Sequence, residues 1–179
     1  VWQREGREYD WNQLTQAAES AQPLVSLVDP DDARFVAPES MPAALAEYCQ
    51  QTSQPVPESD GAFVRCALES LALRYRMVVG WLEQLIDGPL ETIHIVGGGT
   101  QNQLLCQMTA DACNRRVVTG PIEATAIGNV MMQAVSNGDV ASIAEAREVI
   151  RASFSMDEFV PLDPDPWDEA YDRFTRLSS

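Results

Sequence analysis

Residues 92–102 read TIHIVGGGTQN, and this stretch decides which kind of fold the chain can adopt. Its first part, Thr92 to Val96, is mostly β-branched and predicts a buried strand. The glycines Gly97, Gly98 and Gly99 end that strand, and a helical pattern follows over residues 102–114. A strand, a glycine turn and a helix in this order are typical of an α/β fold. The turn also leaves backbone N–H groups available to a ligand at the start of the helix.

The same order returns further along the chain. Residues 115–118 are a second strand candidate, Gly120 and Pro121 interrupt the chain, and residues 124–136 have a helical pattern. Two strands, each followed by a helix, indicate layered α/β architecture, with a β-sheet flanked by helices.

The remaining periodic segments predict helices around this sheet. Apolar residues at helical spacing make residues 60–87 a long core helix, which ends at Gly88 and Pro89. Further helices are expected at residues 11–21, from Ser40 to before Pro55, at residues 142–152 and from Asp165 onward. Residues 23–38 are expected to form a loop, in which residues 24–27 are candidates for an extended segment.

Length and composition favour one compact domain. The chain has 179 residues, of which 45% are hydrophobic. We expect residues 1–162 to form this domain and residues 163–179 to be a linker and docking helix, because an acidic, proline-rich stretch separates them. No run approaches the roughly 20 apolar residues of a membrane helix, and we expect a soluble, cytoplasmic protein without a membrane partner.

Charge limits the possible partners. The sequence has 12 basic residues, all Arg, against 27 acidic ones, and its formal net charge is -15. This balance argues against a nucleic-acid partner, since such surfaces neutralise phosphates with clustered Lys and Arg. The absence of Lys also removes a Walker A loop and Schiff-base chemistry.

Metal and disulfide chemistry have little support in the sequence. The cysteines, which form no CxxC pair, are Cys49, Cys66, Cys106 and Cys113. The only histidine, His94, has no neighbouring ligands for a zinc site, so we expect no bound metal of this kind. A disulfide between Cys49 and Cys66 is geometrically conceivable, whereas reduced thiols are the expectation for a cytoplasmic protein.

Other candidate groups have structural alternatives. We expect His94 to be a packed or edge-facing side chain of its strand. Glu123 could contact a metal or a ribose, or it could complement the dipole of the following helix. The acid pairs Asp31–Asp32 and Asp163–Asp165 have the residue types of a glycosidase, but they lie in proline-rich turn sequence.

The glycine run is ambiguous by its local pattern alone. It lacks the GxGxxG spacing of a dinucleotide fold and the GKS or GKT of a P-loop, so a tight turn and a phosphate site both remain open. Residues 93–102, with Leu104, Leu105 and residues 110–112, resemble the nucleotide motif of the FGGY carbohydrate kinases. Segments that resemble the rhamnulokinase branch of this family are residues 29–31, 37–39, 54–58, 70–75 and 120–125. The resemblance extends from about Trp2 to Pro161.

This resemblance implies an actin-like ATPase fold built from two RNase H-like domains, with the sugar and ATP between them. The chain then corresponds to most of the C-terminal FGGY kinase domain. The nucleotide-binding residues that it implies are Gly97, Gly98, Gly99 and Asn102. Gly98 is expected at the α-phosphate and ribose.

The resemblance also implies an activity for the whole enzyme, with ATP as substrate, ADP as product and Mg²⁺ as cofactor. The expected acceptor is a ketose, L-rhamnulose first, which would become L-rhamnulose 1-phosphate; fuculose and xylulose stay open. The catalytic Asp is expected upstream of this chain, so we name no catalytic residue in it. The expected partner is the N-terminal portion of the kinase, without which this fragment is expected to be inactive.

Two alternatives remain open. The chain could be a non-catalytic nucleotide-binding or interaction module derived from an actin-like half. It could also be a fragment that binds nothing, because the cleft needs both walls. One wall alone exposes apolar surface, so self-association, including a homo-oligomer, would then be expected.

Overall fold

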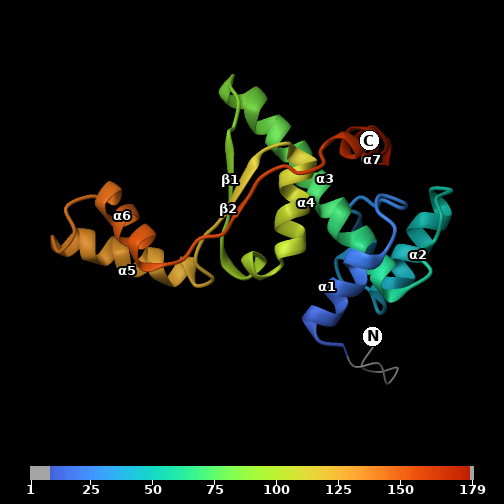
Figure 1. Cartoon of the computed structure of the whole chain (residues 1–179), viewed down its shortest axis with the longest axis horizontal. Helices are drawn as coiled ribbons and strands as arrows, with labels where there is room; N and C mark the ends of the chain where they lie inside the picture. Colours follow the sequence, from blue (N-terminus) through green and yellow to red (C-terminus); the bar gives the residue numbers. More distant parts are fainter. Residues whose placement is uncertain (1–8, 178–179) are drawn as a thin grey trace.

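The computed structural model describes residues 9–177 of the chain. A small central sheet carries a helical layer on one side, and a hairpin of two helices projects away from the strand ends (Figure 1). The predicted α/β class is confirmed, although helices greatly outnumber strands. Among residues 9–177 no helix is both long enough and apolar enough to cross a bilayer.

The first two helices begin where the sequence predicts. α1 (Trp11–Ser20) starts after Asp10, whose carboxylate accepts the N–H of Gln13 at 2.7 Å. α2 (Met41–Gln51) starts after Ser40. Between them lies the predicted loop with a single turn of 3-10 helix, η2 (Ala33–Phe35), and residues 24–27 form no strand.

The long helix α3 (Asp60–Ile86) has the predicted length but only part of the predicted burial. Its first half supplies Leu68 and Leu73 to the core, whereas Leu82 and Leu85 near its end are 42% and 81% exposed. The end of α3 extends beyond α4 (Figure 1). The core prediction was therefore wrong for this end, because the described sheet and helices stop short of it.

The sheet has three strands in the order β1-β2-β3. β1 (Thr92–Ile95) and β2 (Arg116–Thr119) are parallel, and α4 (Gln103–Cys113) connects them, as the two strand–helix segments predict. β3 (Glu158–Phe159) pairs antiparallel with β2. The sequence does not reveal β3, because two residues are too short for an alternating pattern.

One face of the sheet is covered. α4 places Cys106 and Ala110 against Val117 of β2, and it packs against α3 on its other side. α7 (Asp165–Leu177) joins this core through Trp167 and Phe174, which are 6% and 0% exposed, as its aromatic stripe predicts. The division of the chain at residue 162 stays a prediction.

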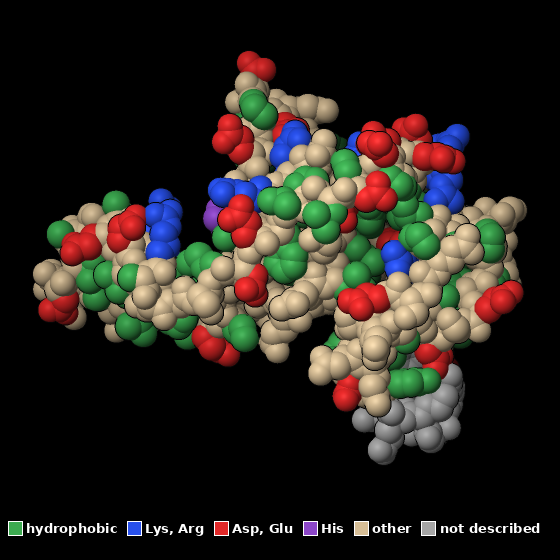
Figure 2. All heavy atoms as spheres, in the orientation of Figure 1, with side chains coloured by type: hydrophobic (Ala, Val, Ile, Leu, Met, Phe, Trp, Pro, Cys, Tyr) green, Lys and Arg blue, Asp and Glu red, His purple; other side chains and the backbone are tan. Residues whose placement is uncertain are grey.

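Within residues 9–177 no helix covers the opposite face of the sheet. His94 is exposed there, next to Arg116, whose guanidinium contacts Thr92 and pairs with Glu158 at 3.3 Å. His94 is the only purple side chain in Figure 2, where it lies at the surface. The prediction of helices flanking the sheet therefore holds for one face.

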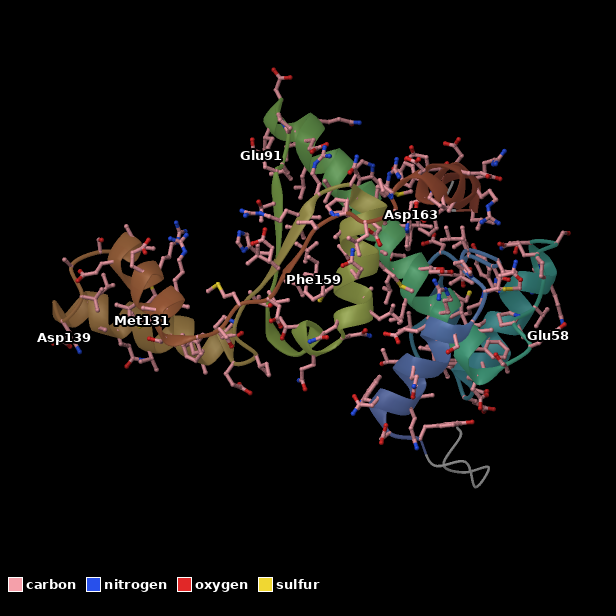
Figure 3. The ribbon with its side chains drawn as sticks, viewed as in Figure 1. Glu58, Glu91, Met131, Asp139, Phe159 and Asp163 are labelled. Atoms are coloured by element: carbon pink, nitrogen blue, oxygen red, sulfur yellow. The ribbon has the colours of Figure 1, made fainter. Side chains whose placement is uncertain are left out.

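The projecting hairpin consists of α5 (Ala124–Asn137) and α6 (Ile143–Ser153). None of the residues of α5 is buried, although several are large and apolar. Figure 3 shows Asp139 at the tip of the hairpin, at the opposite end of the molecule from Glu58. α6 starts after Ser142, as predicted, and the hydroxyl of Ser142 accepts the N–H of Glu145 at 3.2 Å. The other half of the predicted capping box differs, because Glu145 accepts the N–H of Ala141 at 2.6 Å and not that of Ser142.

Candidate functional site

The glycine turn lies where the carboxyl ends of the two parallel strands meet, a common place for ligands in α/β folds. After β1 the segment Gly97–Gln101 forms a 3-10 helix, η3, which leads into α4. The N–H of Gly97 donates to the carbonyl of Pro121 at 3.2 Å, and the N–H of Gly120 donates to the carbonyl of Ile95 at 2.8 Å. These two bonds fix the turn against the end of β2.

The three positions of the turn differ in whether the fold requires glycine there. Gly97 has a φ of +79°, which side chains other than glycine rarely adopt. A Cβ on Gly99 would contact Ile95 at an ordinary 3.5 Å, and a Cβ on Gly98 would meet nothing within 4 Å. The fold therefore requires glycine at position 97 but not at position 98, which is exposed.

Hydrogen bonds hold the backbone of the turn, and one N–H group has no described partner. Thr100 is buried, and its hydroxyl donates to the carbonyl of Gly97 at 2.8 Å. Gly98 occupies the second position of η3, where an N–H has no partner within the helix. This N–H, with open space in front of Gly98, can bind an anionic oxygen.

Asn102 connects the turn to α4. Its Oδ1 accepts the N–H of Leu105 at 3.0 Å, so it is the N-cap of the helix, and its own N–H donates to the carbonyl of Gly99 at 3.2 Å. No described bond uses the Nδ2 of Asn102. The structure thus gives Asn102 a capping role through its Oδ1 and leaves its Nδ2 group, with two N–H donors, without a described bond.

A cavity of about 460 Å³, the strand-end cavity, adjoins this segment. The residues that line it, from three parts of the chain, are Thr100, Gln101, Gln103, residues 119–123, Ile127, Phe154, Ser155 and Asp157. The third part is held in place by β3 and by the carbonyl of Asp157, which accepts the N–H of Thr119 at 2.9 Å. Sequence reasoning missed residues 154–157, because no local pattern indicates that they return to the turn.

The charged side chains that line the strand-end cavity are acidic. Glu123 and Asp157 line it, and no Arg of the described part of the chain does. Glu123 precedes α5 as its N-cap residue but makes no capping hydrogen bond through its side chain. Within residues 9–177 no three His, Cys, Asp or Glu side chains gather closely enough to hold a metal ion.

The predicted acid pairs have structural partners. Asp31 pairs with Arg74, and Asp32 accepts from both the backbone and the side chain of Arg34 at 2.9 Å. These hydrogen bonds hold the pKa of Asp32 below its usual value. Asp163 donates its N–H to Asp111, and Asp165 begins α7. Neither pair lines the strand-end cavity.

The fold resembles that of sugar kinases of known structure. Glycerol kinase from Plasmodium falciparum, solved with ADP, superposes with a TM-score of 0.68 over 99% of this chain and 35% of that one, at 15% identity. Xylulose kinase from Rhodospirillum rubrum gives 0.65 over 93% of this chain and 33% of that one, at 20% identity. The chain therefore has part of an actin-like ATPase fold.

The sequence comparison specifies the family. The description "FGGY family of carbohydrate kinases, C-terminal domain" matches residues 1–137, and the chain belongs to this family. A rhamnulokinase from Bacteroides thetaiotaomicron is 45% identical to it over 97% of the chain. The chain spans only 37% of the length of that relative.

Proposed function

We propose that the chain is the nucleotide-binding part of an ATP-dependent sugar kinase. The observation that carries this proposal is the open space at Gly98, in a turn whose fold does not itself need glycine at that position. A side chain is absent where a ligand would approach the backbone. Membership of the carbohydrate kinase family and the ADP-bound glycerol kinase neighbour support a nucleotide as that ligand.

In this proposal the N–H of Gly98 donates to the α-phosphate of the nucleotide, and Gly97 and Gly99 keep the approach free of side chains. The Nδ2 of Asn102 donates to the nucleotide from the start of α4. No Lys is needed, because backbone amides near a helix N-terminus bind phosphate well. Oxyanion contacts of this kind are strongest when the donors are held rigidly in advance, as Thr100 holds this turn.

For the complete enzyme we propose transfer of the γ-phosphoryl group of ATP to a ketose hydroxyl. The Bacteroides relative makes L-rhamnulose the first candidate, with L-rhamnulose 1-phosphate as the product. Such transfers rest on positioning and on neutralisation of charge. In this proposal Mg²⁺ neutralises charge on the phosphates of the nucleotide.

The remaining portion of the kinase is the proposed partner. β1 is an edge of the described sheet, and the end of α3 beside it exposes apolar residues at helical spacing, which are Tyr75, Val78, Leu82 and Leu85. Additional polypeptide, as the longer relatives have, would continue the sheet and cover this stripe. The same polypeptide would supply the catalytic Asp and most sugar contacts.

The first test is calorimetric titration of the chain with Mg-ADP, for the wild type and for Gly98→Ala. A methyl group at position 98 fits the fold, so the variant should stay folded and bind at least ten times more weakly. Gly80→Ala on α3 is the matched control, since its Cβ also meets nothing within 4 Å. Equal binding by all three proteins would contradict the assignment of the site.

A chimera tests the kinase activity separately. The matching C-terminal segment of the Bacteroides relative would be replaced by this chain, and ATP-dependent phosphorylation of L-rhamnulose would be measured. Activity that is lost with Gly98→Ala supports the proposal. A folded chimera that binds Mg-ADP but phosphorylates no ketose would instead favour a non-catalytic nucleotide-binding module.

A further inference from the structure

Residues 154–163, the return segment, lead from the end of α6 past β2 to α7 (Figure 1). The first part of the return segment closes the strand-end cavity with Phe154, Ser155 and Asp157. Its other end leads into α7, which packs in the core. The return segment therefore connects the candidate site to the core of the molecule.

The contacts of the return segment with the sheet are few. β3 consists only of Glu158–Phe159, whereas strands in globular proteins usually have about 5 to 6 residues. The N–H of Asp157 donates to the hydroxyl of Thr119 at 2.8 Å, and the carbonyl of Asp157 accepts the N–H of Thr119 at 2.9 Å. Such a short edge strand needs further contacts to hold the segment in one place.

Two polar side chains of α4, Gln107 and Asp111, supply these contacts. The Oδ1 of Asp111 accepts the N–H of Leu162 at 2.7 Å and that of Asp163 at 3.4 Å. The Nε2 of Gln107 donates to the carbonyl of Val160 at 2.9 Å and to the Oδ1 of Asp111 at 3.0 Å. Within residues 9–177 the hydrogen bonds described for these two side chains go only to the return segment and to each other.

We propose that Gln107 and Asp111 are positioning residues of the nucleotide site. They hold the return segment where Phe154, Ser155 and Asp157 form one wall of the strand-end cavity. Neither Gln107 nor Asp111 lines that cavity, so both act through the return segment and not on the nucleotide. This inference rests on the proposed function, and it assigns to the site a part of the chain beyond the family match, which ends at residue 137.

Nucleotide binding and the placement of the return segment are then linked. A nucleotide that binds more tightly when this wall is in place also stabilises the placed segment, because coupling between two equilibria is reciprocal. Mg-ADP should therefore slow hydrogen exchange in the return segment. Loss of the contacts with α4 should weaken Mg-ADP binding in turn, since a site is only as well ordered as the residues that support it.

The test combines calorimetric titration with Mg-ADP and hydrogen exchange measured by mass spectrometry on the full chain. Asp111→Ala removes the acceptor, so it should bind Mg-ADP about fivefold or more weakly and exchange faster in residues 154–163 even without nucleotide. Asp111→Asn keeps an oxygen acceptor for the N–H of Leu162 and should retain most of the affinity. Both variants lose the same charge, so a difference between them reports the hydrogen bonds.

Two controls separate positioning from other effects. Gly61→Ala should destabilise the fold at the crossing of α1 and α3, but it should leave the affinity for Mg-ADP unchanged at a temperature at which the chain is folded. Gly98→Ala removes the proposed approach of the phosphate. It should weaken binding and leave the exchange of the return segment unchanged when no nucleotide is present.

The proposal is overturned if Asp111→Ala binds Mg-ADP as tightly as the wild type does, or if exchange in the return segment does not change. Equal losses in Asp111→Ala and Asp111→Asn would also overturn it. Gln107→Leu cannot donate to the carbonyl of Val160 and should show both effects, which gives an independent check if Asp111→Ala folds poorly. A wild type that binds no Mg-ADP would instead overturn the proposed function, and this positioning role with it.

Discussion

The side chain of Asn102 has two ends with different tasks. Its Oδ1 caps α4 by accepting from Leu105, while its Nδ2 is the proposed donor to the nucleotide. Asn102→Asp keeps an N-cap acceptor of equal quality, whereas Asn102→Ala removes it, at a cost of about 1 kcal/mol of stability. We therefore expect the free energy of unfolding to fall in Asn102→Ala only.

Both Asn102 variants should nevertheless bind Mg-ADP more weakly, since both lack the amide donor. Denaturant unfolding measures the first effect and calorimetry the second. If Asn102→Asp binds Mg-ADP as well as the wild type does, Nδ2 has no part in the site and Asn102 is a helix cap alone.

Asp32 allows a prediction about pH. Hydrogen bonds to Arg34 lower its pKa in the folded state, so its carboxylate contributes stability above the unfolded pKa of about 3.9, and this contribution is lost as pH falls through the folded pKa. Asp32→Asn should cost about 0.5 to 1 kcal/mol at pH 7, as for other partly exposed ion pairs. Urea unfolding from pH 7 to pH 2.5 should show the difference from the wild type shrinking toward the acid end. No difference at any pH would show that Asp32 acts only as a cap, because Asn caps equally well.

At the scale of elements, the crossing of α1 and α3 depends on one glycine. A Cβ on Gly61 would lie 2.3 Å from the carbonyl oxygen of Ala17, which is backbone and cannot turn aside. Gly61→Ala should force the helices apart and cost about 1 to 3 kcal/mol or more, as overpacked substitutions do. Thermal unfolding measures the change.

Gly80 on the same helix is the matched control for this crossing. It has open space, so Gly80→Ala should be neutral or should stabilise α3 by up to about 1 kcal/mol. A similar change in both variants would mean that the close crossing does not explain the effect.

The sequence predicts elements well where their signals are local. The long helix α3 follows from its apolar spacing, and β1 follows from a β-branched run that ends in glycines. β3 and the lining of the strand-end cavity by Asp157 depend on pairing between distant segments. No property of residues 154–159 alone indicates such pairing.

The glycine turn shows the same limit within the candidate site. Its sequence indicates a phosphate-binding place, but it does not say which glycine the backbone needs. That distinction rests on the φ of Gly97 and on the open space at Gly98, which only coordinates reveal. The choice of Gly98 as the informative variant therefore comes from the structure.

At the scale of the whole molecule, two surface properties oppose each other. Carboxylates are spread over the face seen in Figure 2, and the net charge of -15 makes copies of the chain repel one another. The apolar stripe at the end of α3 and the adjacent edge strand β1 favour association. Salt screens the repulsion but not the apolar contact, so self-association should increase with ionic strength.

Leu85, which is 81% exposed, provides the test of this surface. Leu85→Lys removes apolar area worth roughly 1.5 to 3 kcal/mol when buried, so it should weaken association about tenfold or more in sedimentation velocity experiments at 0.5 M salt. Its unfolding midpoint should hardly change, because position 85 makes little contribution to the core. Gln84→Lys, at the neighbouring exposed position, makes the same gain of one positive charge without removing apolar area and should associate like the wild type. Equal weakening by both variants would assign the effect to charge. A wild type that stays monomeric at all concentrations would show that the apolar stripe does not drive self-association, so that only the remaining polypeptide of the kinase would bury it.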